Sequence, residues 1–257
     1  MGIFYKYQGT GNDFIMIDNR DDVFQNKTTE LIKLLCDRRF GVGADGLILL
    51  EKSEVADFKM VYFNADGNQG TMCGNGGRCV VAFAKYLDVI SDRTIFEAVD
   101  GKHYATIEGD VVKLQMNDVE EITCNDNSVF LNTGSPHHVQ FEEDLSVMDV
   151  VAIGRKIRNE VYGTAGSNVN FVKKINDSLF KMRTYERGVE DETLACGTGA
   201  TAVAIAMHNL KKTALNKLVL QVEGGELEVS FKVVGKKYTE VFLKGKAVQV
   251  FKGEIKW

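Results

Sequence analysis

The stretch Cys73-Gly74-Asn75-Gly76-Gly77-Arg78-Cys79 decides the fold, because a second stretch of the same kind follows at Ala195-Cys196-Gly197-Thr198-Gly199-Ala200. Both contain Cys-Gly-x-Gly, and each opens an apolar, alanine-rich segment that is typical of a helix (residues 80–87 and 202–210). The two cysteines lie 123 residues apart (196 − 73). The sequence therefore predicts two helices, each with a cysteine at its start.

An internal repeat explains the pair of cysteines. When the chain is aligned with itself at the same offset, without gaps, glycines and apolar residues coincide in the same order in both halves. The coinciding pairs include Thr10 and Thr133, Gly11 and Gly134, Gly43 and Gly166, Tyr62 and Tyr185, Gly76 and Gly199, and Gly101 and Gly224. Coincidence in a glycine-rich chain is the alternative. We favour two copies of one α/β unit of about 120 residues, a common domain size, related by a pseudo-twofold axis and facing a shared cleft.

The predicted first domain spans residues 1–118, and the second spans 119–246. Each begins with strands, continues through a helix and further strands to its cysteine helix, and ends in strands. In the first half we expect strands at 3–8 and 14–18 around a turn, and a helix from Thr28 or Thr29 to Arg38 with Leu31, Leu34 and Leu35 on one face. In the second half we expect a helix over about residues 147–158. The last segment, 247–257, has no counterpart in the repeat and is predicted to return to the first domain as a strand.

Composition excludes several classes of protein. The net charge is −5 and no basic tract exceeds two residues, which argues against a nucleic-acid surface. No apolar stretch approaches the roughly 20 residues that cross a bilayer, and the first residues lack the apolar core of a signal peptide. We therefore expect a cytoplasmic protein with reduced thiols and no membrane or nucleic-acid partner.

The other cysteines do not suggest a metal or disulfide framework. Five cysteines cannot all pair within one chain. Cys36 and Cys124 are interpreted as incidental thiols or small apolar residues, and Cys79 is expected to pack inside the helix. No Cys-x-x-Cys is present, and the four histidines show no ligand spacing with Cys73 and Cys79, so we expect no metal.

Two cysteines at helix starts suggest a reaction type. The N–H groups and dipole of a helix N-terminus favour a thiolate and attract a carboxylate. If two such helix starts face one another, a carbon bearing that carboxylate has a sulfur on each side. One thiolate can then remove its proton while the opposite thiol delivers another, with the N–H groups stabilising the carbanion. This is inversion of a stereocentre by a racemase or epimerase without a cofactor.

The residues alone leave other uses of the cysteines open. The pair can form a redox disulfide, or one nucleophilic cysteine can act with His137 or His138. The symmetry favours matched roles, because a nucleophile and its base do not require two equivalent cysteines.

At this point the chain resembles the diaminopimelate epimerase family. Phe63-Asn64-Ala65-Asp66-Gly67, followed by residues 72–79, is similar to the first signature of the family, and Tyr185-Glu186-Arg187-Gly188, followed by residues 192–199, is similar to the second. Residues 11–14, 41–45 and Gly134-x-Pro136-His137 also match. The resemblance covers nearly the whole chain in order.

The resemblance implies an α/β (α+β) fold of two pseudo-symmetric domains, each a curved, mostly antiparallel sheet around a central helix, often in a homodimer. It implies an isomerase that interconverts LL- and meso-diaminopimelate, independently of pyridoxal phosphate, on the route to lysine and peptidoglycan. Matching by motif position makes Cys73 and Cys196 the two acid/base groups, with His137 and Glu186 supporting their protonation states. The substrate-binding residues implied in the same way are Asn12, Asn64, Gly74, Asn75, Asn168, Glu186, Arg187, Gly197 and Thr198.

Two positions depart from the family pattern. Gly46 stands where the family usually has Gln, leaving room for a water or for a residue from another loop, and Ser135 stands where it usually has Asn. Both positions face substrate in the family, so a cofactor-independent racemase of another amino acid stays the alternative. Proline racemases usually have His where this chain has Asn75, and phenazine-type isomerases lack the cysteine pair. A binding module that kept the fold fits poorly, because both thiols and both glycine motifs are intact.

Overall fold

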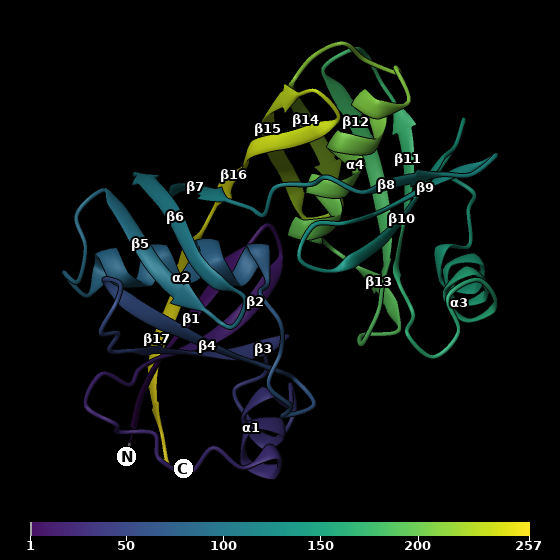
Figure 1. Cartoon of the computed structure of the whole chain (residues 1–257). Helices are drawn as coiled ribbons and strands as arrows, with labels where there is room; N and C mark the ends of the chain where they lie inside the picture. Colours follow the sequence, from purple (N-terminus) through teal and green to yellow (C-terminus); the bar gives the residue numbers. More distant parts are fainter. Residues whose placement is uncertain (1) are drawn as a thin grey trace. The chain divides into compact units, whose positions relative to one another are not determined.

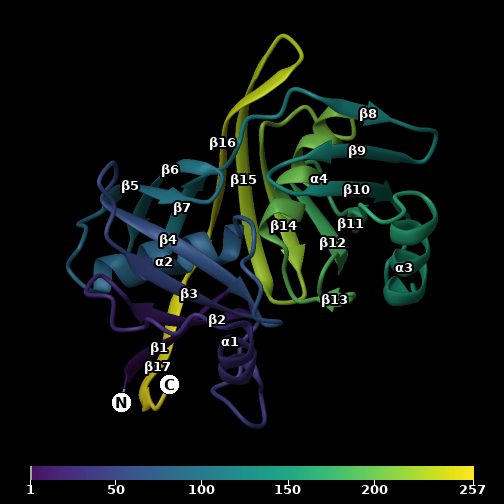
Figure 2. The same cartoon turned by 60° about the horizontal axis from the view of Figure 1, so that its bottom comes forward.

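The computed structural model describes residues 2–257. It divides into two compact units, the first formed by the chain up to Leu114 with Gly245–Trp257, and the second by Gln115–Lys244 (Figures 1 and 2). None of the helices in the described chain is long and apolar enough to cross a membrane.

The first unit is a sheet that starts with the last strand of the chain. Neighbouring strands follow the order β17–β1–β2–β3–β4–β5–β6–β7. The two chain ends therefore lie side by side, because Gly2 pairs with Ile255, as Figure 2 also shows. The strands are β1 (Gly2–Gly9), β2 (Asn12–Asp18), β3 (Gly46–Glu51), β4 (Phe58–Asn64), β5 (Arg93–Ala98), β6 (Gly101–Glu108), β7 (Val111–Gln115) and β17 (Val248–Ile255).

The second unit repeats this sheet. Its order is β8–β9–β10–β11–β12–β14–β15–β16, and the short β13 pairs with β12. The strands are β8 (Ile122–Cys124), β9 (Ser128–Asn132), β10 (Pro136–Phe141), β11 (Asn168–Lys174), β12 (Leu179–Glu186), β13 (Asp191–Thr193), β14 (Lys217–Val222), β15 (Gly225–Val234) and β16 (Lys237–Lys246).

The two sheets have the same sequence of strand directions. From β17 onward the pairs run antiparallel, antiparallel, parallel, antiparallel, parallel, antiparallel and antiparallel, and the series from β8 onward is identical. Each parallel pair is joined through a connection that contains a helix, as parallel strands require. The predicted α/β fold of two repeated, mostly antiparallel units is confirmed.

The cysteine helices lie inside these sheets. Helix α2 (Gly74–Tyr86) is enclosed by strands of the first unit and α4 (Gly197–Asn209) by strands of the second (Figure 1). Residues 197–207 of α4 are all buried. A helix that is apolar on every side has to be enclosed in this way, which explains its alanine-rich sequence.

The two remaining helices lie in the other parallel connections. Helix α1 (Thr29–Cys36) is capped by the Thr28 side chain, and α3 (Val150–Glu160) is capped by Asp149. The predicted apolar face of α1 was partly wrong. Leu34 is exposed, and the residues that pack into the core are Ile32, Leu35 and Cys36. Helix α3 also starts three residues later than predicted, at the Asp149 cap, which leaves Val147 exposed.

The hairpin between β1 and β2 places Asn12 beside the start of α2. Thr10 and Gly11 both have positive φ angles (59° and 87°), which a two-residue turn of type I′ requires. The turn brings Gly9 opposite Asn12. A Cβ on Gly9 would lie only 3.2 Å from the Asn75 carbonyl oxygen, so the glycine allows strand and helix to approach closely.

Candidate active site

Cys73 is the N-cap residue of α2. Its backbone is extended (φ −108°, ψ 118°), its Sγ accepts the Gly76 N–H at 3.4 Å, and its carbonyl accepts the Gly77 N–H at 2.7 Å. The side chain is partly exposed. The N–H groups of Gly74 and Asn75 lie in the first turn of the helix, the part of a helix whose backbone N–H groups can bind an anion.

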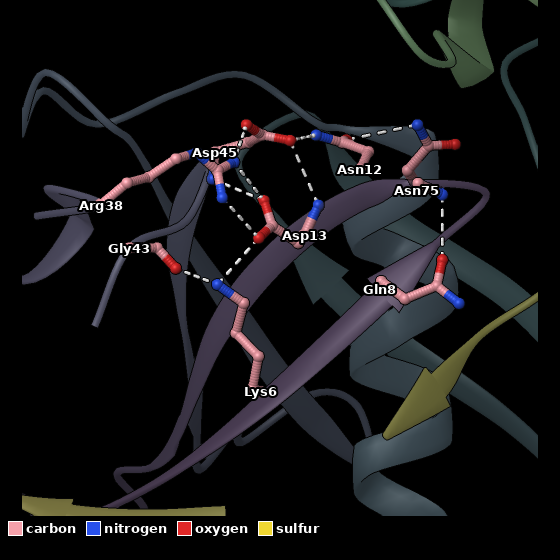
Figure 3. Close-up of polar contacts among 9 residues, drawn as sticks. Lys6, Gln8, Asn12, Asp13, Arg38, Gly43, Asp45 and Asn75 are labelled. Carbon is pink, nitrogen blue, oxygen red and sulfur yellow. Dashed lines mark hydrogen bonds and ion pairs between the residues drawn. The ribbon is translucent and has the colours of Figure 1, made fainter. Parts of the chain in front are cut away.

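Asn12 and Asn75 lie next to this thiol. The Asn12 Oδ1 is 3.8 Å from the Cys73 Sγ and accepts a hydrogen bond from the Asn75 Nδ2 at 3.2 Å (Figure 3). The Asn75 Oδ1 in turn accepts from the Arg78 guanidinium at 2.6 Å. Three polar residues that were proposed from the sequence therefore gather at the start of α2.

Arg78 is a functional candidate that sequence reasoning did not single out. It is fully buried and donates to the Lys246 carbonyl (2.6 Å), the Thr10 hydroxyl (3.3 Å) and Asn75. Burial lowers the pKa of its guanidinium. The groups on α2 that interact electrostatically with it are the thiols of Cys79 and Cys73, so its charge favours a thiolate near the start of α2. The sequence signal was its place within the first cysteine motif.

Asn64 and Gly46 lie at facing positions of the pair β3–β4, where Gly46 pairs with Asn64. Asn64 is exposed at the end of β4. The space beside Gly46 is filled, because a Cβ there would lie 2.5 Å from the Tyr62 ring and 2.5 Å from the Phe63 carbonyl oxygen. The space beside Gly46 is thus filled by Tyr62 of the adjacent strand β4, and not by a residue from another loop.

Cys196 has the same relation to α4 as Cys73 has to α2. It is the N-cap, its backbone is extended (φ −124°, ψ 112°), and its Sγ accepts the Gly199 N–H at 3.4 Å. The thiol is buried and lies 3.5 Å from the Thr198 hydroxyl. The Thr198 carbonyl accepts a hydrogen bond from Thr133 at 2.8 Å, which ties the first turn of α4 to the loop after β9.

His137 is a neutral, buried histidine of β10. Its Nδ1 lies 3.1 Å from the Asn170 Nδ2, and burial lowers its pKa to about 3, with a smaller contribution from Arg187. Asn170 also accepts from Thr184 on its Oδ1 (3.0 Å), so it presents its NH₂ group to the histidine. The His137 Nδ1 is therefore an acceptor and the proton is on Nε2, for which no hydrogen-bond partner exists among the described residues.

Asn168, Glu186 and Arg187 meet where β11 starts and β12 ends. The Asn168 Oδ1 accepts the Arg187 N–H at 2.9 Å, and its Nδ2 donates to the Pro136 carbonyl at 3.3 Å. Glu186 accepts from the Thr193 hydroxyl at 2.8 Å. The Asn168 side chain thus joins the backbone at Pro136, the first residue of β10, to the backbone at Arg187, just after β12.

Ser135 and Asn170 complete the polar surroundings of the second unit. Ser135 is partly exposed in the turn before β10, and its carbonyl accepts the Thr133 N–H at 3.1 Å. Sequence reasoning missed Asn170, which follows Asn168 by two residues and therefore lies on the same face of β11.

The remaining cysteines are Cys36, Cys79 and Cys124, of which the first two are buried. All five are free thiols, and burial raises the pKa of both Cys36 and Cys79 to about 12. Cys124 is exposed and contacts the Asn209 side chain. In the part of the chain that the structure describes, no three His, Cys, Asp or Glu side chains gather as a metal site.

Comparison with known proteins identifies close relatives over the full chain. The family model described as diaminopimelate epimerase matches residues 4–121 and 129–250, one segment for each copy of the repeat. The diaminopimelate epimerase of Flavobacterium psychrophilum is 62% identical over 253 residues, covering 98% of this chain and 99% of its own. That of Chlorobaculum tepidum is 43% identical, covering 96% and 98%.

The fold also matches solved structures of low sequence identity. A phenazine biosynthesis protein of the PhzF family from Bacillus anthracis superimposes with a TM-score of 0.80 at 14% identity, covering 99% of both chains. This likeness shows the fold alone. The family match and the two relatives go further, and together they show that this chain belongs to the diaminopimelate epimerase family.

Proposed function

We propose that this protein converts LL-diaminopimelate into meso-diaminopimelate by proton transfer between two cysteines, without a cofactor, in the biosynthesis of lysine and peptidoglycan. The observation that supports this most strongly is the matched geometry of the thiols. Each cysteine caps one central helix, and each sulfur accepts a backbone N–H at 3.4 Å. Membership in the family and 62% identity to a diaminopimelate epimerase supply the substrate.

In the proposed reaction one cysteine acts as a thiolate and the other as a thiol. The thiolate takes the α-proton, and the electron pair of the broken C–H bond spreads onto the substrate carboxylate. The opposite thiol then donates its proton to the other face of the carbon, which restores the C–H bond with inverted configuration. After product release the sulfurs have exchanged their protonation states, so the enzyme is ready for the reverse direction. The proposal requires that both sulfurs reach one carbon from opposite sides.

The helix starts provide the binding groups for the reacting carboxylate. We assign it to the N–H groups of Gly74-Asn75 and Gly197-Thr198, because first-turn N–H groups bind anions and stabilise charge that develops on them. We assign further contacts with the substrate to Asn12, Asn64, Asn168, Glu186 and Arg187, with Arg187 at the distal carboxylate. The forked donors of Arg187 suit a carboxylate.

His137 and Glu186 are proposed to support the protonation states of the cysteines. A histidine whose pKa is near 3 remains neutral at physiological pH. It can donate from Nε2 to a sulfur or a substrate oxygen but is too weak a base to activate a nucleophilic thiol. His138 is engaged with the Tyr162 hydroxyl at 2.9 Å. These contacts disfavour a nucleophilic cysteine–histidine pair and agree with matched roles for the two thiols.

The assembly and location are proposed from the resemblance to the family. We propose a homodimer and the cytoplasmic location that an enzyme of lysine biosynthesis implies. Size-exclusion chromatography with light scattering tests the homodimer, and a mass of one chain of 28.5 kDa would contradict it.

The function is tested by an assay of the purified protein on a panel of substrates. LL-diaminopimelate, meso-diaminopimelate, proline and other amino acids are incubated separately after dialysis against chelator, and stereoisomers are separated by chiral chromatography. We expect interconversion of the two diaminopimelates at full rate without added cofactor. Absence of diaminopimelate turnover together with racemisation of another amino acid would establish the alternative function instead.

A further inference from the structure

A cluster of charged side chains lies behind Asn12 in the first unit. This cluster consists of Lys6, Asp13, Arg38 and Asp45, which come from β1, β2 and the segment between α1 and β3 (Figure 3). Arg38 binds both oxygens of Asp13 (2.7 and 2.9 Å) and reaches the Asp45 Oδ1 at 2.7 Å. The buried Lys6 contacts Asp13 at 2.8 Å and also donates to the Gly43 carbonyl.

Asp13 keeps this cluster charged. Burial by itself would raise the pKa of Asp13, but the hydrogen bonds from Arg38 and Lys6 outweigh that effect and hold the pKa at about 2. The Asp13 side chain is only 18% exposed, and it contacts Lys6 once and Arg38 through both of its oxygens. Arg38 is thereby fixed where it also binds Asp45.

Asp45 receives hydrogen bonds on both oxygens. Arg38 donates to Oδ1, while the Asp13 backbone N–H (3.2 Å) and the Asn12 Nδ2 (2.5 Å) donate to Oδ2. A carboxylate with these donors accepts only, so the side of the Asn12 amide that faces it has to be the NH₂ group.

Asn75 fixes which atom of the Asn12 amide lies on the side away from Asp45. The Asn75 Oδ1 is bound by Arg78, and Asn75 therefore presents its NH₂ group to Asn12. Asp45 and Asn75 therefore favour the same orientation of the Asn12 amide. In it, Oδ1 points toward Asn75 and lies 3.8 Å from the Cys73 sulfur. An acceptor beside the sulfur favours the protonated thiol, because a thiol donates and a thiolate does not.

We infer that Asp45 is a positioning residue of the reaction: through its hydrogen bond to Asn12 it turns the amide oxygen of Asn12 toward Cys73 and so favours the thiol form of that cysteine. The inference rests on the proposed function for its catalytic meaning, but not for its test. Asp45 acts through Asn12 and is not assigned any contact with the substrate.

Other charged and titratable groups also act on Cys73. Arg78 and Cys79 on α2 interact electrostatically with it, and Asp13 and Lys6 lie behind Asn12 on the hairpin β1–β2. Arg78 favours the thiolate, while the Asn12 oxygen opposes it. Any test therefore has to separate the orientation of Asn12 from a direct effect of charge.

Asp45→Asn is the most informative variant. When Arg38 holds the carbonyl oxygen of the new side chain, its NH₂ group takes the place of Oδ2 and meets the Asp13 N–H and the Asn12 NH₂ group. We expect the Asn12 amide to turn over in response, against the preference set by Asn75. The turned amide then offers an N–H donor to Cys73. We expect the pKa of Cys73 to fall by about one unit, as is typical when a hydrogen bond to the charged form replaces one to the neutral form.

The readout is the rate of alkylation of Cys73 by iodoacetamide between pH 5 and 10, measured for each cysteine by mass spectrometry. Cys73 is partly exposed, and the exposed Cys124 serves as an internal control whose profile should not move. Asp66→Asn, which removes a carboxylate from an exposed turn of the same unit, is the matched control variant. Asp45→Ala, which deletes the acceptor without adding a donor, is measured in parallel so that one misfolded variant does not end the test.

The comparison that decides is made in an Asn12→Ala background. If Asp45 acts through Asn12, Asp45→Asn shifts the Cys73 profile in the native background and leaves it nearly unchanged in Asn12→Ala. Asp45→Ala, in which Asn75 alone orients the Asn12 amide, gives the same pattern with a smaller shift. Equal shifts in both backgrounds would mean a direct charge effect, and no shift in the native background would mean that the amide does not turn; either result overturns the inference. Alkylation needs no turnover, so failure here is separate from failure of the epimerase assay on the native protein.

Discussion

The Sγ atom of Cys73 lies 3.4 Å from the backbone nitrogen of Gly76 and accepts its hydrogen bond. The contact recurs at the same distance one repeat later, at the start of α4. A sulfur in this position is stabilised as a thiolate by the N–H groups and dipole of the helix. Two such sulfurs in one chain can each accept and donate a proton, as a reversible inversion requires.

Replacing either N-cap cysteine by alanine should abolish turnover. Cys73→Ala and Cys196→Ala each remove one of two obligatory proton-transfer groups, and such groups typically contribute about 10²–10⁴-fold to rate. Steady-state assays in both directions, with circular dichroism to verify folding, measure the loss. Cys124→Ala, at an exposed thiol, is the control and should keep full activity. Near-normal turnover by either N-cap variant would rule out two matched bases.

The equivalent glycines Gly76 and Gly199 should respond differently to alanine. A Cβ at Gly76 would first meet the ends of two flexible side chains, Ile48 Cδ1 at 2.9 Å and Met60 Cε at 3.3 Å. A Cβ at Gly199 would lie 2.5 Å from the Oδ1 of the buried Asn170.

We therefore expect Gly199→Ala to lower the free energy of unfolding by about 1–3 kcal/mol, the usual effect of overpacking. Gly76→Ala should be nearly neutral, since alanine is about 1 kcal/mol more favourable than glycine within a helix. Urea denaturation of both variants provides the comparison. A larger loss at residue 76 than at residue 199 would show that the packing around the two helix starts is not as described.

His137 should make the protein less stable in mild acid. Its pKa is about 3 in the folded state and about 6.5 in an unfolded chain, so between these values the unfolded state binds more protons. The free energy of unfolding therefore falls as pH is lowered through this window, by at most about 1.4 kcal/mol per pH unit from this group. Above pH ~6.5 the effect is absent.

The matched variant is His137→Gln, which keeps a polar side chain but cannot titrate. Denaturation midpoints at pH 7.5, 6.0 and 5.0 should show native protein losing stability relative to the variant as the pH falls. Parallel curves would mean that His137 takes up a proton in the folded state.

Ser135→Ala should weaken substrate binding more than chemistry. The Ser135 side chain cannot ionise near neutral pH, so it cannot replace a thiol, yet its hydroxyl can donate to or accept from a substrate group. Loss of one hydrogen bond to a charged group costs about 1.5–3 kcal/mol, or roughly 10- to 150-fold in KM if expressed wholly in binding. Measured kcat and KM for both diaminopimelate isomers decide this. A fall in kcat at constant KM would place Ser135 in the chemical step instead.

Local sequence patterns predicted the elements that depend on local chemistry. The N-cap position of Cys73 followed from a cysteine before glycines and an alanine-rich segment, and the hairpin turn followed from Gly9-Thr10-Gly11-Asn12. The repeat was visible because turn glycines are constrained by backbone conformation, as at Gly11 and Gly43, whose φ angles are both positive.

Long-range packing could not be predicted in the same way. Arginine is usually exposed, so nothing in its neighbours indicated that Arg78, in the second turn of α2, is fully buried. The contact of Asn12 with Asp45 joins residues 33 positions apart, and the Tyr62 ring fills the space beside Gly46 only because β3 and β4 pair in the observed register. Such contacts depend on how the strands are arranged rather than on local pattern.

The most direct test of the two-cysteine mechanism follows the proton itself. LL-diaminopimelate is incubated with the enzyme in deuterium oxide, and product and remaining substrate are separated at low conversion and analysed by mass spectrometry. Two bases predict that each product molecule has gained one deuteron at the inverted carbon, since its new proton comes from the opposite thiol, while the remaining substrate is unlabelled. Product that retains the original proton at that carbon would contradict the account, because a single group would then have both removed and returned it.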